Sequence, residues 1–279
     1  MAGDLHCHTK LSDGSLGIDD LINIAKRKNL SALAVTDHDT MAGANRAVII
    51  GKRQGVHVIH GVEISTMDKS RGRLAHMLCY LCDSPDRLEG LCHRIGQSRH
   101  SAAMDMVRKV MRYFPITPEL VVKCATGSSN IYPQHIMHAL MDIGYADSVY
   151  GDVYQKLFGT EGVARVPIEL PDPRDVLQAI HEAGGIAVLA HTHVYQSEDL
   201  LEELIPLGLD GIEVWHPYHT EEQSETLAAL AWQHNLLATG GSDFHGMYSR
   251  TPRPIASTAM PDDAVTALLQ YKQKQIKKG

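Results

Sequence analysis

The stretch Asp4-Leu5-His6-Cys7-His8, with Asp13 a few residues on, decides how the rest of this chain is interpreted. If residues 3–8 form a strand, Asp4, His6 and His8 project from one face, because strand side chains alternate with period two. Two imidazoles one strand step apart can chelate one cation, and the Asp13 carboxylate, beyond the strand end, can reach the same place. Two ordinary surface histidines explain this stretch alone equally well, so the remaining segments must decide.

The segments that follow alternate between helix and strand patterns. Residues 17–28 and 41–54 have helical apolar spacing, whereas 31–36 and 56–62 are apolar runs of strand length. This alternation is typical of a parallel α/β sheet, whose chemistry gathers at the C-terminal ends of its strands. The two strands end at Asp37-His38-Asp39 and at Glu63, and therefore deliver ligand-type side chains to that edge.

A hairpin is predicted next, and the α/β pattern returns near the end of the chain. Residues 64–82 contain a turn at Arg71-Gly72-Arg73 and a returning strand, 74–81, that carries His76. Later helices are predicted at 173–183, 198–207, 220–234 and 262–273, and strands at 186–190, 209–214 and 236–239. These strands end at His191, Trp215-His216 and Gly240-Gly241-Ser242-Asp243-Phe244-His245.

Between these parts the strand signals fade. Residues 86–113 have long helical periodicity, and 133–140 and 148–158 suggest shorter helices. We therefore expect an α/β domain in two parts, 1–84 and 166–279, interrupted by a mostly helical insertion at 85–165. Its Arg94, Arg99 and His135 could cover a site, although a solvated helix face explains most of its charges more simply.

Composition bounds the function. With 279 residues, 44% hydrophobic and 21% charged, the chain has the length and composition of a large globular domain. The net charge of −7 argues against an extended nucleic-acid surface, so no stable nucleic-acid partner is expected. No apolar run approaches the roughly 20 residues that span a bilayer, and the motif at residue 4 leaves no room for a signal peptide. A cytoplasmic protein is expected.

Cysteine usage agrees with a reducing compartment. Five cysteines, an odd number, are scattered among apolar residues, which suits free thiols better than a disulfide framework. Cys79 and Cys82 have zinc-knuckle spacing, but no second pair with that spacing exists. We therefore do not expect a structural zinc there.

Nine ligand-type side chains fall at or beside predicted strand ends, in a chain with 17 histidines. Chance rarely places so many ligand-type side chains at equivalent points of a fold. Mixed imidazole and carboxylate ligation suits Mn²⁺, Fe²⁺ or Zn²⁺ without choosing among them, and more than four ligands imply at least two ions. The nine are His6, His8, Asp13, His38, Glu63, His76, His191, Asp243 and His245.

In combination and in order, these motifs resemble the PHP (polymerase and histidinol phosphatase) family. The resemblance implies a distorted (β/α)₇ TIM-like barrel with a helical insertion and two or three divalent metal ions. It puts His6, His8, Glu63 and Asp243 on one ion; Glu63 would bridge to a second, held also by His76 and His191. Asp13, His38 and His245 would hold the third.

The resemblance also implies a phosphoester hydrolase acting on small phosphorylated metabolites. A hydroxide bridging two ions would attack phosphorus, with His216 or His193 near the leaving oxygen. Arg99, Arg94 and His135 are the candidate phosphate contacts. In related 3′,5′-bisphosphonucleotide phosphatases a second arginine aligns with Pro133 of this chain, and its loss favours a cyclic or sugar phosphate diester as the substrate.

Three alternatives stay open at this stage. The bisphosphonucleotide phosphatase is one, with His135 touching phosphate in place of the arginine. A 5′–3′ exoribonuclease acting on short RNA ends is another, since related PHP enzymes process RNA from that end. The third is a non-catalytic metal-binding regulator, which the complete set of nine ligands disfavours.

Overall fold

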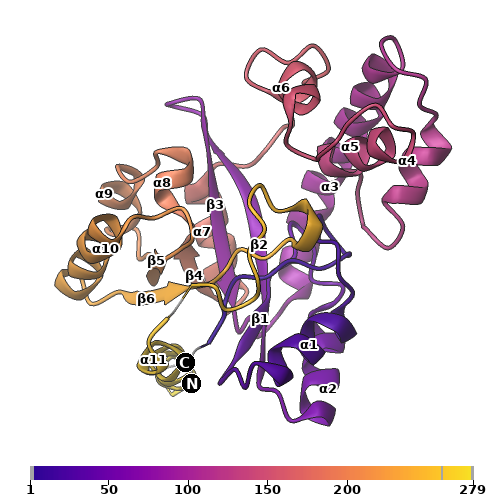
Figure 1. Ribbon diagram of the computed structural model, residues 1–279. Helices are drawn as coiled ribbons and strands as arrows, with labels where there is room; N and C mark the ends of the chain where they lie inside the picture. The colour runs from indigo at the N-terminus through magenta and orange to yellow at the C-terminus, as the bar shows by residue number, and fades with distance from the viewer. Residues whose placement is uncertain (1–2, 259, 278–279) are drawn as a thin grey trace.

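The computed structural model describes residues 3–258 and 260–277, and in these ranges six strands form one curled sheet (Figure 1). Their order is β1-β2-β3-β4-β5-β6. The strands are β1 (Leu33–Val35), β2 (Val58–Asp68), β3 (Arg73–Tyr80), β4 (Ile186–Leu189), β5 (Gly211–Trp215) and β6 (Leu237–Gly240).

The predicted hairpin is confirmed. β2 and β3 pair antiparallel from Gly61 opposite Tyr80 to Asp68 opposite Arg73, and Gly72 turns the chain with φ 67°, a left-handed conformation that favours glycine. β3 also pairs antiparallel with β4, whereas the remaining neighbours are parallel. The sheet is therefore mainly parallel with one reversed strand, and β2 is longer than the sequence predicted.

Helices cover the sheet and build a second group beside it. The α/β part contains α1 (Ile18–Arg27), α2 (Ala44–Gln54), α7 (Pro173–Glu182), α8 (Thr192–Tyr195), α9 (Leu200–Leu204), α10 (Glu221–Gln233), η1 (Gly246–Tyr248) and α11 (Asp262–Ile276). The inserted part contains α3 (Asp86–Val110), α4 (Pro118–Cys124), α5 (Pro133–Asp142) and α6 (Asp152–Phe158). No helix in the described ranges has the length and apolar character needed to cross a bilayer.

The predicted strand at residues 3–8 is wrong as a continuous strand. The segment makes isolated bridges, Asp4 with Leu33 and Cys7 with Phe244. The Asp4 carbonyl accepts from the Ala34 N–H, and the Cys7 carbonyl accepts from the Thr36 N–H. The segment therefore advances three residues where the neighbouring β1 segment advances two, so it carries one extra residue. Such a bulge interrupts the ladder and the period-two alternation.

An apolar layer lies under the polar edge of the sheet. Ile59 and Glu63 of β2 share one face, as do Leu78 and His76 of β3, because strand side chains repeat every two residues. Ile59 and Leu78 pack in a buried cluster with Leu268 of α11, which covers that cluster from the end opposite the polar edge. The apolar layer therefore supports Glu63 and His76 from below.

The insertion has a hydrophobic cluster of its own. Val107, Ile136 and Leu140 join α3 to α5, and Phe158 adds α6. Tyr248 of η1 belongs to the same cluster although it comes from the chain after β6. In Figure 1, α4, α5 and α6 stand away from the sheet, and α3 connects them to it.

Candidate metal centre

Glu63 stands at the middle of a buried group of five imidazoles. Its Oε2 lies 3.1 Å from His6 Nε2, 3.1 Å from His8 Nε2 and 3.2 Å from His38 Nδ1. Its Oε1 lies 2.8 Å from His76 Nδ1 and 2.7 Å from His191 Nε2. Each carboxylate oxygen thus faces a different set of nitrogens, which is the arrangement that a bridging carboxylate needs.

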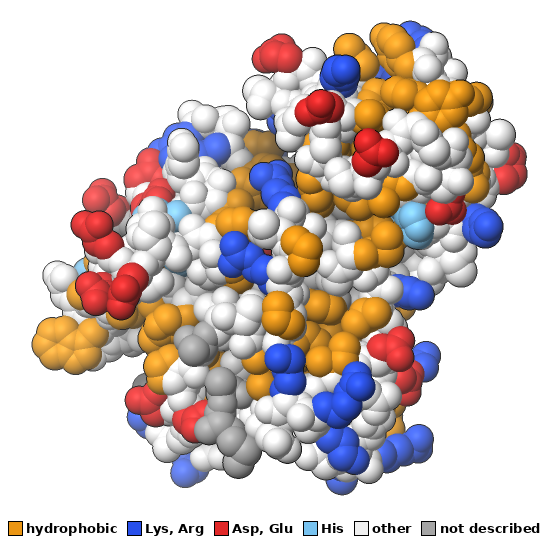
Figure 2. All heavy atoms as spheres, in the orientation of Figure 1, with side chains coloured by type: hydrophobic (Ala, Val, Ile, Leu, Met, Phe, Trp, Pro, Cys, Tyr) orange, Lys and Arg blue, Asp and Glu red, His pale blue; other side chains and the backbone are white. Residues whose placement is uncertain are grey.

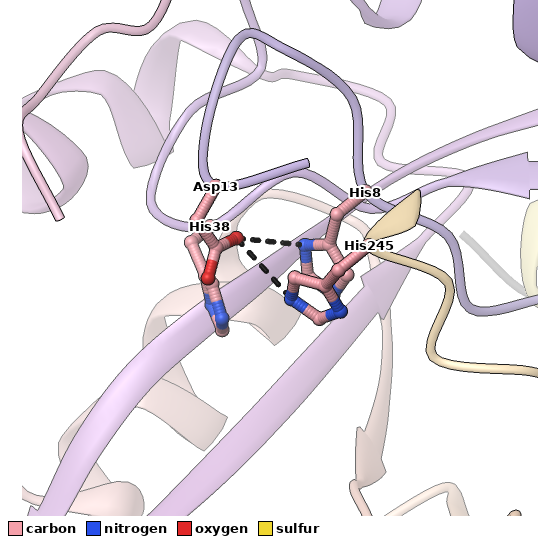
Figure 3. Close-up of side chains that lie close together, drawn as sticks. All are labelled: His8, Asp13, His38 and His245. Carbon is pink, nitrogen blue, oxygen red and sulfur yellow. Dashed lines mark ion pairs between the residues drawn. The ribbon is translucent and has the colours of Figure 1, made fainter. Parts of the chain in front are cut away.

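A second group forms beside the first, around Asp13 (Figure 3). Asp13 Oδ1 lies 3.3 Å from His245 Nε2 and 3.8 Å from His8 Nδ1. The His8 and His245 rings stack with centroids 4.1 Å apart, and His38 is near them, 4.6 Å from His8. These side chains come from three separate segments of the chain, around residues 8–13, 38 and 245.

The structure brings all nine predicted ligands into one cluster. At this centre, ligand atoms within 4.8 Å of one another form three groups among the described residues. They differ from the predicted sets in membership, because His8 and His38 each belong to two groups. His191 belongs to none of the three and joins the cluster through Glu63 Oε1, 2.7 Å from its Nε2. The groups are His6, His8, Glu63 and Asp243; His38, Glu63 and His76; and His8, Asp13, His38 and His245.

The donor atoms fit divalent cations. Both ring nitrogens of His8, Nδ1 of His38 and Oδ1 of Asp13 are buried and find no hydrogen-bond partner among the residues that the structure describes. Buried polar atoms without partners are costly, so their convergence needs an explanation such as an ion. Imidazole with carboxylate is a donor set that Mn²⁺, Fe²⁺ and Zn²⁺ accept.

Electrostatics point the same way. Burial lowers the pKa of His8, but the nearby carboxylates of Asp243 and Glu63 outweigh it and raise the pKa to about 10. Burial also lowers the pKa of His38, to about 3, although Glu63 and Asp13 oppose this. The pKa of Glu63 stays well below its usual value, against the effect of burial, because imidazoles surround it. The carboxylates therefore keep negative charge that a cation can neutralise.

Unusual backbone holds several of these residues at the strand ends. Asp39, His191 and Asp243 have positive φ values of 55°, 23° and 48°, which non-glycine residues seldom adopt. A Cβ on Gly241 would lie 2.4 Å from the backbone nitrogen of His6, so only glycine lets the two segments approach this closely. Such local strain is common where function constrains the chain.

Buried carboxylates outside the nine hold the ligands in place. Glu213 accepts a hydrogen bond at 2.8 Å from the His191 N–H, and its other oxygen lies 2.8 Å from His6 Nδ1. Asp4 does not face the cluster; it accepts from the N–H and hydroxyl of Ser242. The sequence analysis missed Glu213, although an acidic residue between Ile212 and Val214 of an apolar strand run is a usable signal.

Arg99 lies beside the cluster, but it is paired. Its Nη2 donates to Asp39 Oδ2 at 2.6 Å and to the Ser65 hydroxyl at 2.9 Å, and its guanidinium stands 4.6 Å from the Tyr132 ring centroid. The Tyr132 hydroxyl in turn donates to the His38 carbonyl at 3.5 Å. Arg99 Nε is buried and finds no partner within the described residues. Arg99 therefore forms an ion pair through Nη2 and still has Nε free to donate a hydrogen bond to a ligand.

The other two predicted phosphate contacts, His135 and Arg94, form no hydrogen bond or ion pair with the cluster around Glu63 within the described residues. His135 is buried, and its Nδ1 accepts from the Tyr132 N–H at 3.2 Å, so it caps α5. Burial lowers the pKa of His135 to about 4, which keeps the ring neutral near pH 7. Arg94 is exposed on α3. Gln134, which the sequence analysis did not single out, donates to Asp13 Oδ2 at 3.0 Å.

His216 and His193 differ in their distance from the ligands. His216 is buried, and its Nε2 lies 3.4 Å from Asp243 Oδ2. His193 pairs with Glu198, and its ring is 5.0 Å from that of His219, which is 5.2 Å from His216. Of the two, His216 therefore contacts a candidate metal ligand.

Arginines of the chain after β6 also approach this region. Arg253 stands 4.7 Å from the Tyr218 ring centroid and, with His216 and His219, lines a hollow of about 550 Å³. Arg250 stands 5.5 Å from the ring centroid of Tyr150, in the insertion. Figure 2 shows Lys and Arg side chains between the two parts of the molecule. The sequence analysis did not single out either arginine.

Comparisons with known proteins agree with this geometry. Residues 4–129 match the family model of the PHP domain. The chain is 37% identical to a phosphoribosyl 1,2-cyclic phosphate 1,2-diphosphodiesterase from Eggerthella lenta, over 90% of this chain and 97% of that protein. It is 31% identical to a 5′-3′ exoribonuclease from Haemophilus influenzae, over 87% and 89% of the two chains.

A solved structure extends the similarity to the whole fold. A protein from Bifidobacterium adolescentis, assigned to the metal-dependent phosphoesterases, superimposes with a TM-score of 0.88 at 31% identity. The match covers 96% of this chain and 95% of that one, so it includes the inserted helices as well as the sheet.

Proposed function

The chain belongs to the PHP family of phosphoester hydrolases, and on that premise we propose that it hydrolyses a small cyclic phosphodiester of ribose and then the resulting monoester. The observation that carries the proposal is the buried Glu63, whose two carboxylate oxygens together face five imidazoles. Support for the cyclic substrate comes from the Eggerthella lenta relative, which matches nearly the full length of both chains. Pro133, where bisphosphonucleotide enzymes of the family carry arginine, also favours it.

We assign the nine residues as ligands of two or three ions of Mn²⁺, Fe²⁺ or Zn²⁺. When bound, such ions supply an activated water and neutralise charge on the phosphoryl oxygens. Glu63 would hold two ions at once, and Glu213 fixes His6 and the backbone of His191. Because neighbouring groups share His8 and His38, the third ion would share ligands with the other two.

In this proposal the remaining side chains bind and orient the substrate. Opening the cyclic diester adds one water across a P–O bond, and a second water then releases inorganic phosphate from the monoester. His216, beside Asp243, is placed to protonate a leaving oxygen, and His193 is the outer alternative. Arg99, with Nε available, would bind a phosphate next to His38, and Arg253 a group in the adjoining hollow.

Two further proposals concern the closure of the barrel and the compartment in which the protein works. We propose that residues 3–8 act as a seventh, bulged strand that joins β1 to the chain after β6 in a distorted barrel, which their hydrogen bonds on both sides support. We also propose that the protein works in the cytoplasm. Its five cysteines are free thiols, the form that a reducing compartment maintains.

The test compares kcat/KM for three substrates: 5-phosphoribosyl 1,2-cyclic phosphate, 3′-phosphoadenosine 5′-phosphate and a 5′-phosphorylated RNA oligonucleotide. The cyclic phosphate should be turned over best, with release of inorganic phosphate. Chelation should abolish activity and Mn²⁺ should restore it. A bisphosphonucleotide or RNA preference of about a hundredfold or more would assign the chain to one of those alternatives instead.

A further inference from the structure

A second group of metal-ligand side chains lies in the insertion, away from Glu63. Cys124 at the end of α4 faces His138 and Asp142, which are one helical turn apart on α5. One ligand atom from each lies within 4.8 Å of the others. Cys124 Sγ is 3.8 Å from Asp142 Oδ2, and His138 Nε2 is 3.6 Å from Asp142 Oδ1.

The two separations, each to a different oxygen of Asp142, lie in the range of ligand separations around a tetrahedral ion. Bonds of about 2.0–2.3 Å to imidazole, carboxylate and thiolate put neighbouring ligand atoms roughly 3.3–3.8 Å apart. Cys124 and His138 are half-buried and Asp142 is exposed, so the fourth position opens to solvent. Thiolate with imidazole and carboxylate selects Zn²⁺ and similar borderline ions over Mg²⁺ or Ca²⁺.

An independent contact supports the histidine as a ligand. His138 Nδ1 lies 2.8 Å from the Tyr248 hydroxyl, which leaves Nε2 toward Cys124 and Asp142. Ligating histidines usually have such a partner on the other ring nitrogen, because it fixes the ring and its tautomer. Tyr248 belongs to η1, directly after His245, and its ring also contacts that of His135 at 5.5 Å.

We propose that Cys124, His138 and Asp142 form a separate binding site for a divalent cation of the Zn²⁺ class, which joins α4 to α5 and, through Tyr248, to the loop that carries His245. Binding replaces the thiol proton of Cys124 by the ion and releases that proton to solvent. Proton release should therefore accompany loading at pH 7.

Cobalt(II) is the probe that separates this site from the centre around Glu63. A thiolate bound to Co²⁺ gives a near-ultraviolet charge-transfer band, and the nine predicted ligands of the centre include no cysteine. The wild-type protein loaded with Co²⁺ should show the band. Cys124→Ser should lose it, whereas the matched control Cys82→Ser, at another thiol, should keep it.

A second pair of variants tests the geometry without removing the thiol. Tyr248→Phe removes only the hydroxyl that contacts His138 Nδ1. It should weaken Co²⁺ binding, measured by titration of the charge-transfer band, about 10–100-fold. Asp142→Asn at the exposed ligand should weaken it as well, and circular dichroism checks that each variant is folded. The proposal is overturned if wild type gives no band, or if the band survives Cys124→Ser.

Discussion

The centre around Glu63 and the cluster at Cys124 are assembled in opposite ways. The centre collects nine side chains from segments spread between residues 6 and 245, and the sheet brings them together. The cluster collects three side chains from two neighbouring helices, α4 and α5. One set is buried and shares ligands between groups, whereas the other is half-exposed and shares none with the groups at the centre. The sheet can therefore support several coupled ions, and the helix pair a single separate one.

The largest effect is expected where the ligands are shared. Glu63→Gln removes the charge that faces five imidazoles, so it should disturb two groups at once. Turnover should fall by about 10³-fold or more, and metal analysis should find about one ion fewer per chain, with the circular dichroism spectrum unchanged. Glu89→Gln, at an exposed position of α3, is the matched control. Full activity with an unchanged metal count would remove Glu63 from the centre.

Substitution of a residue that only positions the ligands should reduce activity less than substitution of a ligand. Glu213→Gln keeps the size of the side chain but loses the charge beside His6 and His191. His6 holds the pKa of Glu213 at about 2 against the effect of burial, so the carboxylate is ionised whenever the enzyme works. Metal affinity should fall about 10–100-fold, and excess Mn²⁺ should restore activity. Glu222→Gln, at an exposed position of α10, should behave as wild type.

Arg99 lies between the two regions and tests whether the insertion binds substrate. Arg99→Ala should raise KM for a substrate with a second phosphate by about 10–100-fold, and much less for an aryl phosphate. Asp39→Asn breaks the same ion pair but leaves the arginine. If both variants change KM equally for both substrates, Arg99 serves the ion pair and does not bind phosphate.

The smallest effect should come from the insertion cluster. Free Zn²⁺ at about 100 times its Kd stabilises a folded protein by about 2.7 kcal/mol, which raises Tm by several degrees in a chain of this size. Part of this rise should be missing in Cys124→Ser, whereas Cys82→Ser should show it in full. Differential scanning calorimetry on both variants, each with and without Zn²⁺, makes the comparison. Equal rises would place the stabilising Zn²⁺ only at the centre.

The same contrast explains what the sequence could predict. The gathering of ligand-type side chains at strand ends could be predicted because parallel strands place their C-terminal residues at one edge, and because the motifs resemble a known family. The bulge at residues 3–8 could not be found, since a single extra residue leaves no periodic signal. Cys124 and His138 were not connected because they lie on different helices, and only the packing of α4 on α5 brings them together. Arg99 was found, but its partner Asp39 depends on tertiary contact.

The hydrogen bonds that residues 3–8 make to both β1 and the chain after β6 have a consequence for biosynthesis. His6 and His8 leave the ribosome 235 residues or more before Asp243 and His245, since 243 − 8 = 235. At about 5–20 residues per second, on the order of ten to fifty seconds separate them. Throughout that time the early histidines lack their late partners, and any ion that they take is held by an incomplete set. With the nine residues as the proposed ligands, selection among competing metals is therefore completed only when the segment around Phe244 docks beside Cys7.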